Sequence, residues 1–488
     1  MQDIQSHKQA FWFTTINYVG ILIGLLATLF LYPYDYDFYG EVAYIDSLAQ
    51  ILYPVLVFGG SQALIHFYPS LSASSKESLV GYTLKTIFRI FLVIAIVLVV
   101  ASVLFAWDKK VYLFYALPLA LLMAFIEVFK RQAANLQKIA IPTFYEKIIP
   151  KLALPIVFIL FLYGYISNQV AFSVFIAFYF ILVFLIINYV LKRFSISIFD
   201  TSSHFSEISK KSYFTYSFYS FLGSFGSFLA FRIDGLMIPE FLDFTANGAY
   251  KNAVNFAAAM AIPATGLFTI YAPQISIFIK NEDWKTLQIK YIETAKLLFF
   301  IGAVLLGCVF VGAEPFFKML PTADKLLPIL PVLYILGVNV LFNMATGFSS
   351  EIISYSSYYK FNIVAVFVLV VLNFLLNLFF LFQTNLGIVG ISIATLISLV
   401  IFNVVKLIFI YKKMKILPFN KSYFILFCTM VAIVLAVCFL PKFTNNWLEI
   451  FTKVGLIVTV SIVTTYQLKA LPALNFWLNK TILRKQKH

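Results

Sequence analysis

The chain has 488 residues, of which 62% are hydrophobic, 18% aromatic and only 12% charged, and its mean hydropathy is +0.92. A water-soluble fold of this length could not bury so much apolar side chain, so the composition excludes a soluble protein. The formal net charge of +15 lies mainly on alternate connections between apolar segments, and no nucleic-acid-binding motif accompanies it. The charge therefore predicts membrane topology and contact with anionic membrane lipid, with no nucleic-acid partner.

Apolar runs long enough to cross a bilayer as helices follow one another along the chain. Short strands of alternating hydrophobicity do not occur, so we expect an all-α, polytopic membrane protein with about 14 transmembrane helices. The expected spans are residues 11–31, 44–67, 81–107, 111–132, 144–164, 169–191, 214–239, 248–275, 286–312, 326–347, 360–382, 387–411, 422–440 and 448–468.

Lysines and arginines predict the orientation of these spans. If the N-terminus is cytoplasmic, most of the basic residues fall on cytoplasmic connections or adjoining helix ends. The first outer loop then carries Asp35, Asp37 and Glu41 and no basic residue. We therefore expect both termini to be cytoplasmic. The first apolar run is too long for a signal peptide and lacks a small-residue cleavage site, so we expect it to be a retained helix.

Two polar connections predict the organisation into lobes. The connection 192–213 follows six expected helices, and the connection 412–421 follows twelve. Because an even number of spans returns the chain to the same side, the two six-helix blocks would have the same orientation, as in a parallel repeat. We expect an N-lobe over residues 1–200, a C-lobe over residues 201–415, and two further helices with a basic cytoplasmic tail over residues 416–488. Glycines and prolines at matching places support the repeat: Gly40, Pro54 and Pro69 in the first block, and Gly248, Pro263 and Pro273 in the second.

Three motifs occur in order along the chain. They are Tyr39-Gly40 with the segment 58–64, the segment 231–238 with 247–250, and the paired asparagines Asn373 and Asn377 followed by Gly-Ile-x-Gly at 387–390. Together they resemble the multidrug/oligosaccharidyl-lipid/polysaccharide exporter superfamily, and within it the Wzx-like polysaccharide-biosynthesis flippases. The chain departs from the family at His66, where relatives often carry an arginine.

This resemblance implies two six-helix lobes around a central cavity, in a bacterial inner membrane. It implies a transporter that flips a polyprenyl-diphosphate-linked oligosaccharide to the outer leaflet by alternating access, for O-antigen, capsule or exopolysaccharide biosynthesis. The expected partners are this lipid-linked oligosaccharide, membrane lipid, H⁺ or Na⁺ as coupling ion, and polysaccharide assembly proteins. We expect no cofactor and no enzymatic activity, because no nucleotide-binding loop occurs and the four histidines share no metal-ligand spacing.

Arg232 and Asp234 are the most unusual charged positions, because they fall within an expected span. A buried arginine costs about 3 kcal/mol on insertion scales, so it should face a protein interior, a watery cavity or a counter-ion. Residues two apart on a helix point in nearly opposite directions, so we expect at least one of the two to have a partner elsewhere. Lys251 is a candidate partner for Asp234. Two interpretations remain: a structural ion pair, or contact with a diphosphate or a coupling ion.

A second set of basic residues lies nearer the cytoplasmic side. Lys85 and Arg89 are four residues apart, as are Lys147 and Lys151, so each pair shares one face of its helix. These faces could attract a diphosphate to an inward-open cavity. The alternative is that the side chains reach to the membrane interface, as lysines near helix ends ordinarily do. Lys296 belongs to the same group.

Two other functions compete with flipping. A cation-coupled multidrug exporter of the same superfamily would place acidic residues at the cavity, whereas the charges at membrane depth here are mostly basic. A membrane glycan polymerase or ligase would need a substantial outer loop with catalytic bases. No outer connection of the expected topology is long or contains histidine, so the sequence ranks this class last.

Overall fold

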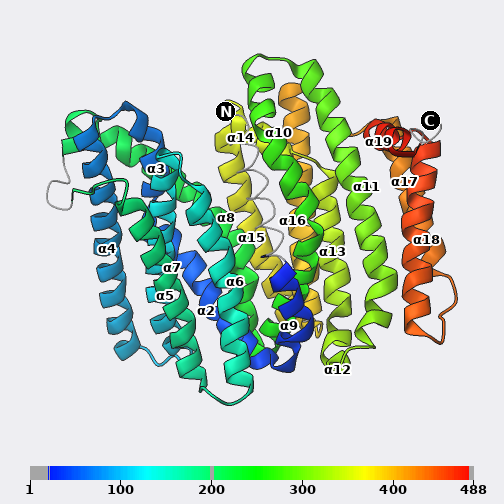
Figure 1. Ribbon diagram of the computed structural model, residues 1–488, viewed down its shortest axis with the longest axis horizontal. Helices are drawn as coiled ribbons and strands as arrows, with labels where there is room; N and C mark the ends of the chain where they lie inside the picture. Colours follow the sequence, from blue (N-terminus) through cyan, green and yellow to red (C-terminus); the bar gives the residue numbers. More distant parts are fainter. Residues whose placement is uncertain (1–19, 21, 198–202, 483–488) are drawn as a thin grey trace. The chain divides into compact units, whose positions relative to one another are not determined.

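A computed structural model of the protein describes residues 20, 22–197 and 203–482 (Figure 1). All regular elements in these ranges are helices, which confirms the predicted all-α class. The chain divides into two compact units, Met1–Lys251 and Asn252–His488. We refer to them as unit 1 and unit 2 and describe each by itself.

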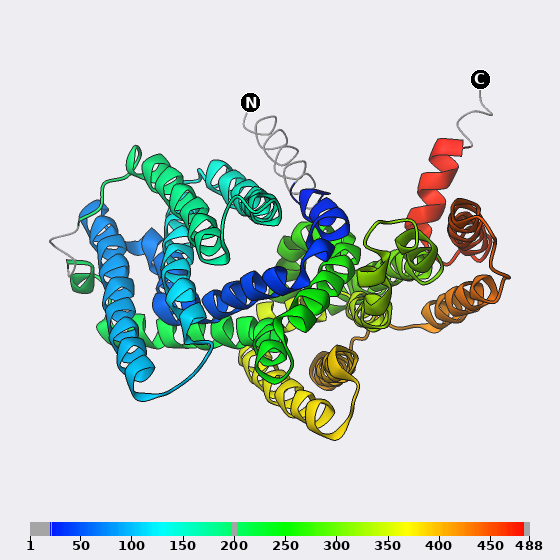
Figure 2. The same ribbon diagram turned by 90° about the horizontal axis from the view of Figure 1, so that it is seen from below.

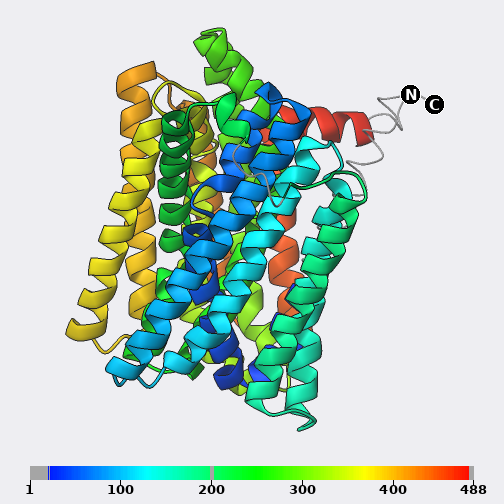
Figure 3. The same ribbon diagram turned by 90° about the vertical axis from the view of Figure 1, so that its left-hand side faces the viewer.

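Unit 1 contains long helices whose axes follow a common direction (Figure 3), joined by short 3₁₀ segments. Its elements are η1 (Tyr32–Tyr34), α2 (Tyr36–Val57), α3 (Gly60–Phe67), η2 (Tyr68–Ser70), α4 (Ala73–Leu104), α5 (Lys110–Asn135), α6 (Ala140–Leu162), α7 (Asn168–Leu191), η3 (Ser203–Ser206), α8 (Lys210–Phe241) and the first part of α9 (Phe244–Met260). Helix α2 lies along α8 (Figure 2) and packs against α5.

Unit 2 contains the end of α9 and the remaining helices. These are α10 (Ile262–Lys280), α11 (Trp284–Phe317), α12 (Ala323–Leu326), η4 (Leu327–Ile329), α13 (Leu330–Ala345), α14 (Ser349–Tyr355), α15 (Tyr359–Gln383), α16 (Gly387–Met414), α17 (Lys421–Cys438), α18 (Asn446–Gln467) and α19 (Pro472–Ile482). Helices α15 and α16 form an antiparallel pair, and α17 and α18 pack on α11. The sequence did not predict α19, which lies across the direction of α18 (Figures 1 and 3).

Ten described helices are long and apolar enough to cross a membrane, and the bent pair formed by α2 and α3 makes eleven. The chain is therefore a multi-pass membrane protein. Three expected spans lie outside this set. The first, 11–31, falls largely outside the described residues; α6 carries Glu146, Lys147 and Lys151 in its first half; and the expected span 248–275 is divided at Ala261 into α9 and α10.

The break between α2 and α3 is caused by two residues in the left-handed region. Phe58 has a φ of 45° and Gly59 a φ of 73°, and the two helix segments meet at a bend of 46°. A side chain on Gly59 would overlap the carbonyl oxygen of Ser217 on α8. Pro54, where the sequence predicts the bend, remains inside α2. Glycine thus serves both the turn and the close approach of two helices here.

The two glycines matched by the expected repeat lie in contact with each other's helices in unit 1. A Cβ on Gly40 would overlap the carbonyl oxygen of Phe244, and a Cβ on Gly248 would overlap that of Tyr36. The Asn247 amide also donates to the Gly40 carbonyl oxygen over 2.8 Å. Small residues allow helices in lipid to approach this closely. The reciprocal contact explains why both positions carry glycine.

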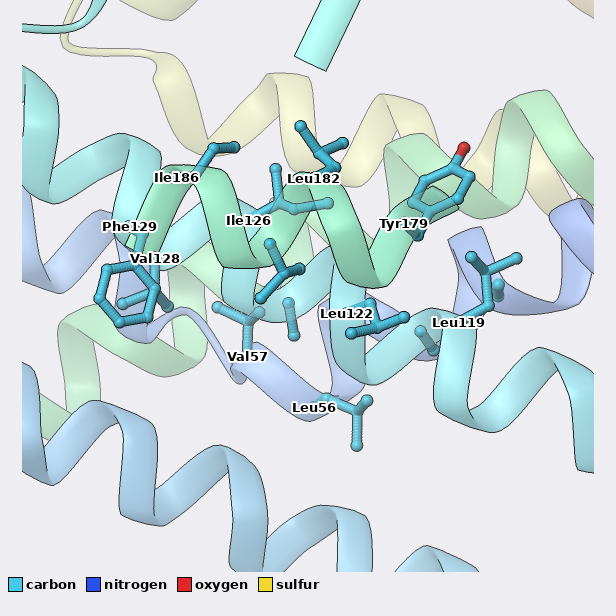
Figure 4. Packing of buried hydrophobic residues seen from close by; sticks show 14 of the residues in the cluster. Leu56, Val57, Leu119, Leu122, Ile126, Val128, Phe129, Tyr179, Leu182 and Ile186 are labelled. Carbon is cyan, nitrogen blue, oxygen red and sulfur yellow. The ribbon is translucent and has the colours of Figure 1, made fainter. Parts of the chain in front are cut away.

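Apolar side chains from α2, α5 and α7 form the core of unit 1 (Figure 4). Leu56, Leu119, Ile126 and Leu182 are among the buried residues of this cluster. Tyr179, on the same face of α7, marks one end of the packed group in Figure 4. This packing fixes how α2 and α7 are rotated about their axes. It therefore also fixes the direction in which the polar residues of each helix point.

The boundary between the compact units lies 51 residues beyond the expected lobe boundary at 200/201. The difference arises because α8 and the start of α9 pack against α2, so they belong to the unit that contains α2. The division into two six-helix lobes and two extra helices rests on repeat arithmetic and remains a prediction.

Candidate functional site: a cation cluster in unit 1

A hydrogen-bonded chain of three polar residues connects α8 to α2. The Arg232 Nε donates to Gln50 Oε1 over 2.7 Å, and the Gln50 Nε2 donates to Asp46 Oδ2 over 2.8 Å. Asp46 and Gln50 are four residues apart, so they share the face of α2 that carries this contact. Gln50 thus separates a guanidinium from a carboxylate while bonding to both.

Three lysines belong to the same electrostatic network. The carboxylate of Asp46 attracts the ammonium groups of Lys151 and Lys251, while Arg232 repels both. Lys147 lies one helical turn from Lys151 on α6 and also repels it. Four cations and one carboxylate give a formal charge of 4 − 1 = +3. We call these five residues, together with Gln50, the cation cluster.

Two members of the cation cluster, Asp46 and Arg232, lie deep within their helices. Asp46 is ten residues from the start of α2, which corresponds to about 15 Å along the helix axis, and Arg232 is about 14 Å from the end of α8. The hydrocarbon layer is about 30 Å thick, so these two residues lie far from either helix end that could reach water directly. Their positions are costly for unpaired charge. Arg232 is half-buried, and Lys147 and Lys151 on α6 are exposed.

Asp234 has surroundings different from those of Arg232. Its Oδ2 accepts a hydrogen bond from the Tyr250 hydroxyl over 2.8 Å, and its side chain is buried. The expected divergence of Arg232 and Asp234 on α8 agrees with these separate partners. The charge of the Asp46 carboxylate acts on the Lys251 ammonium. The pairing of Asp234 with Lys251 remains a prediction.

The structure brings together only part of the basic set named from the sequence. Lys147 and Lys151 join the cation cluster, whereas Lys85 and Arg89 lie on α4, which packs against α2, α3 and α5. Lys296 is buried in unit 2, where its ammonium donates to the Ala470 carbonyl oxygen over 3.0 Å. This contact ties α11 to the segment that precedes α19. The structure therefore gives Lys296 a structural contact.

Ion pairs neutralise three other glutamates. Glu127 pairs with Lys130 at 3.1 Å and with Arg131 at 2.7 Å, and Lys130 also pairs with Glu146 at 2.9 Å. Glu293 pairs with Lys290 at 2.9 Å. The spacing of three and four residues explains the pairs within one helix, whereas packing of α5 with α6 brings Lys130 to Glu146.

Sequence reasoning missed two members of the cation cluster, Asp46 and Gln50. Both fall inside an expected span, four residues apart, in the same way as the lysine pairs that were noticed. Tyr179 on α7 was also missed, and it is within reach of the charges of Asp46 and Arg232. The available signal was an acidic residue and an amide on one face of an apolar helix. Such residues in lipid need a partner and indicate a polar interior surface.

The cation cluster offers donors suited to an anion. Arginine presents a planar fork that matches phosphate oxygens, and each ammonium supplies up to three donors. Within the described ranges, no group of three or more histidine, cysteine, aspartate or glutamate side chains could hold a metal ion. The side chains of the cation cluster are thus of the types that bind anions.

No protein-family model matches the sequence, and a search of curated proteins finds no match. Among solved structures, the lipid II flippase MurJ in an inward closed conformation is similar with a TM-score of 0.71 and 14% identity, covering 94% of this chain and 99% of that chain. A multidrug resistance MATE family transporter of the MOP superfamily, in an inward-facing conformation, gives a TM-score of 0.63 and 14% identity, covering 81% of this chain and 94% of that chain. A MATE structure in a bent conformation gives 0.53 and 15%, with coverage of 81% and 94%. The chain therefore has the fold of these proteins.

Proposed function

We propose that this protein is a transporter that flips a polyprenyl-diphosphate-linked oligosaccharide from the cytoplasmic to the outer leaflet of a bacterial inner membrane. The product would serve the synthesis of a cell-surface polysaccharide such as O-antigen, capsule or exopolysaccharide. The proposal includes cytoplasmic N- and C-termini, no enzymatic activity, and polysaccharide assembly proteins as partners. The single observation that carries it is the excess positive charge of the cation cluster.

Binding of an anionic substrate would lower the electrostatic free energy of the cation cluster. Each charged side chain at the centre of a bilayer costs about 3 kcal/mol on insertion scales, and Asp46 balances only one of the four cations. A diphosphate diester is a dianion, so its binding would reduce the local charge. Arg232 would bind it most specifically, because charge-assisted bonds from a guanidinium to phosphate oxygens are strong and directional.

The bridge through Gln50 suggests how the cation cluster accepts and releases its ligand. In the structure, Arg232 bonds to a neutral amide and not to a carboxylate. A neutral partner is replaced by a phosphate more easily than a counter-ion is, since no ion pair has to be broken. The lobes would then rock around the bound head group while the polyprenyl chain remains in lipid. The fold shared with the lipid II flippase and MATE structures supports alternating access of this kind.

A cation-coupled multidrug exporter is the second candidate. Asp46 favours it, because a carboxylate at membrane depth is the group that a cationic drug or a coupling ion requires. The shared fold with MATE transporters is compatible with this function. The charge balance favours the flippase, since a cationic drug would meet four positive side chains around one carboxylate. H⁺ and Na⁺ both remain proposed coupling ions.

The test is reconstitution in liposomes that contain a polyprenyl-diphosphate oligosaccharide. The measured quantity is the rate at which the glycan becomes accessible to an external glycosidase. The wild-type protein should expose the glycan faster than empty liposomes do. Arg232→Ala should slow exposure roughly 10- to 100-fold, the loss expected for a charged hydrogen bond of about 1.5–3 kcal/mol.

Arg193→Ala is the matched control, because it removes an exposed arginine of unit 1, just beyond the end of α7, that lies outside the cation cluster and outside the basic pairs named from the sequence. It should leave the rate near that of wild type. Equal rates for Arg232→Ala and wild type, with both proteins folded, would make Arg232 structural. A wild-type protein that exposes no matched glycan but exports a cationic dye in an Asp46-dependent manner would establish the exporter instead.

A further inference from the structure

A second buried cation lies in unit 2, on a helix that the cation cluster does not include. Lys406 on α16 is only 1% exposed, and it is eight residues, or about 12 Å, from the end of the helix at Met414. Its ammonium donates to Ser350 Oγ over 2.8 Å and lies 4.2 Å from the ring centroid of Phe402. A buried ammonium ordinarily contacts a carboxylate. In the described part of the chain no ion pair reaches Lys406.

The opposite charge that acts on Lys406 is that of Glu351, the residue next to Ser350 in α14. No direct ion pair joins the two side chains among the described residues. Glu351 is half-buried, and the seven-residue α14 packs against α16, α15 and α10. Gly347, with a φ of 59°, precedes α14 and turns the chain between α13 and α14. The two charges therefore lie on two helices that pack against each other, α14 and α16, without forming an ion pair.

Asn403 supplies a second, independent observation. It lies three residues before Lys406, on the same face of α16, and is 1% exposed. Neither its amide nitrogen nor its amide oxygen has a hydrogen-bond partner among the described residues. Buried polar groups are rarely left unpaired. The amide thus has an acceptor available for an ammonium and donors available for a carboxylate beside the separated pair.

The charges around this site are few. Helix α13 carries no charged residue, and α14 carries only Glu351. Helix α15 carries Lys360 in its exposed first turn, and α16 adds the exposed Lys412 and Lys413 near its end. The uncharged titratable groups of these helices are tyrosines. Helix α10, which packs against α14, carries Tyr271 and, in its last turn, Lys280, and Tyr291 of α11 lies within reach of the charge of Glu351. One carboxylate thus acts on one buried ammonium, and α13, α14 and α15, which pack against α16, carry no other acid.

We propose that Glu351, Lys406 and Asn403 form a proton-binding site in unit 2, and that the ligand is a single proton taken up by Glu351. An O–H bond forms on the Glu351 carboxylate as the O–H bond of a hydronium ion or buffer acid breaks. The Lys406 ammonium keeps its three N–H bonds, so the charge of the pair changes from zero to +1. The Asn403 amide can accept from the carboxylic acid or donate to the carboxylate, so it serves both protonation states. The site is independent of the proposed substrate.

Infrared difference spectroscopy of the purified full-length protein as a function of pH tests the site directly. A protonated carboxylic acid absorbs apart from a carboxylate, so each titrating carboxyl gives its own signal. One pH-dependent signal should disappear in Glu351→Gln and remain in Glu293→Gln, a paired glutamate of the same unit. The midpoint should move to higher pH in Lys406→Gln, because the attraction that favours the carboxylate is lost. Lys406→Arg, which keeps the charge, should preserve the midpoint and provides a folded variant if Lys406→Gln does not fold.

Two outcomes would overturn the proposal. If the titrating signals of wild type and Glu351→Gln are identical, Glu351 does not bind the proton. If Glu351 titrates with the same midpoint in wild type and in Lys406→Gln, the two residues do not form one site. If the titration midpoint of Glu351 shifts in Asn403→Leu, the Asn403 amide is part of the site. If the midpoint is unchanged, the amide is not part of the site.

Discussion

In unit 1, four cationic side chains share one carboxylate, whereas in unit 2 the single ammonium of Lys406 faces the single carboxylate of Glu351. The members of the first group are exposed or half-buried, and Lys406 is fully buried. Both arrangements use a neutral side chain next to the cation: Gln50 for Arg232, and Ser350 for Lys406. The difference lies in the charge balance.

This difference indicates what each region can bind. An excess of positive charge that is partly open to its surroundings can be balanced by a ligand from outside, and a dianion fits it. A pair of opposite charges has no charge excess, and adding a proton to its carboxylate is the smallest change that alters its charge. The same residue types would thus serve the proposed substrate site in one region and the proposed proton-binding site in the other.

The largest expected contrast comes from making the same substitution in both regions. Lys406→Glu would place a second carboxylate near Glu351 in a buried site and would remove the ammonium that donates to Ser350, and an uncompensated buried charge costs about 3–5 kcal/mol. Lys151→Glu changes an exposed side chain near four other charges, and should alter the free energy of unfolding by only about 1 kcal/mol. Thermal unfolding of both variants in detergent measures this. Equal destabilisation by the two substitutions would contradict the distinction between a buried charge in unit 2 and exposed charges in unit 1.

Binding of inorganic pyrophosphate should depend on unit 1 alone. We expect Arg232→Ala to raise the dissociation constant about tenfold, the equivalent of about 1.4 kcal/mol. Arg232→Lys should recover part of the affinity, because lysine keeps the charge but not the planar fork. Lys406→Arg should have no effect. Isothermal titration calorimetry of the purified variants provides the comparison, and a loss of affinity in Lys406→Arg would argue against two separate sites.

A smaller effect is expected when the neutral bridge is replaced by a charge. Gln50→Glu would pair directly with Arg232 and make the cation cluster more like the pair in unit 2. The stability should change by no more than about 1 kcal/mol, because the new ion pair with Arg232 is opposed by repulsion from the Asp46 carboxylate, which loses its donor. The pyrophosphate affinity should fall a few-fold, since the ligand must then displace an ion pair. Gln50→Met, which is similar in size but neutral, is the control. Tighter pyrophosphate binding by Gln50→Glu would contradict the role of the bridge.

The smallest effect concerns a carboxylate outside the membrane spans. Glu207 accepts hydrogen bonds from the Ser72 hydroxyl at 2.5 Å, the Ser75 hydroxyl at 2.6 Å and the Ser72 amide at 2.9 Å. These bonds hold the pKa of Glu207 below its ordinary value. Because the folded state lowers this pKa, the contact stabilises the protein at neutral pH and is lost as the pH falls through the lowered pKa.

Hydrogen exchange of the Ser72 amide measures this contact. At neutral pH, the Ser72 amide should be better protected from exchange in wild type than in Glu207→Gln. In acid, the protection of this amide should be the same in both proteins. Infrared spectra of wild type should contain a carboxyl signal that titrates in acid and that is absent in Glu207→Gln. Lys406→Gln should not shift this signal. Protection that persists in acid would show that the carboxylate does not hold this segment.

Local features of the chain were predictable because they depend on neighbours in sequence. Apolar runs required helices, since lipid leaves backbone groups no other partners. The pairing of Glu127 with Lys130 and Arg131 followed from their spacing of three and four residues. The break within the expected span 44–67 was not predictable from neighbours in sequence. Pro54 stays inside α2, and the break lies at Phe58 and Gly59, where the close approach of α8 at Ser217 leaves no space for a side chain on residue 59.

The sequence by itself determined the all-α membrane class, most of the spans and the basic character of the membrane-embedded charges. Only the tertiary structure decided which charges meet. Arg232 and Gln50 are 182 positions apart, and Lys406 and Ser350 are 56 apart. Helix periodicity defines the face on which a residue lies but not the helix that this face contacts. The packing of α2 with α8 and of α14 with α16 selects Asp46 and Gln50 for one site and Glu351 and Asn403 for the other.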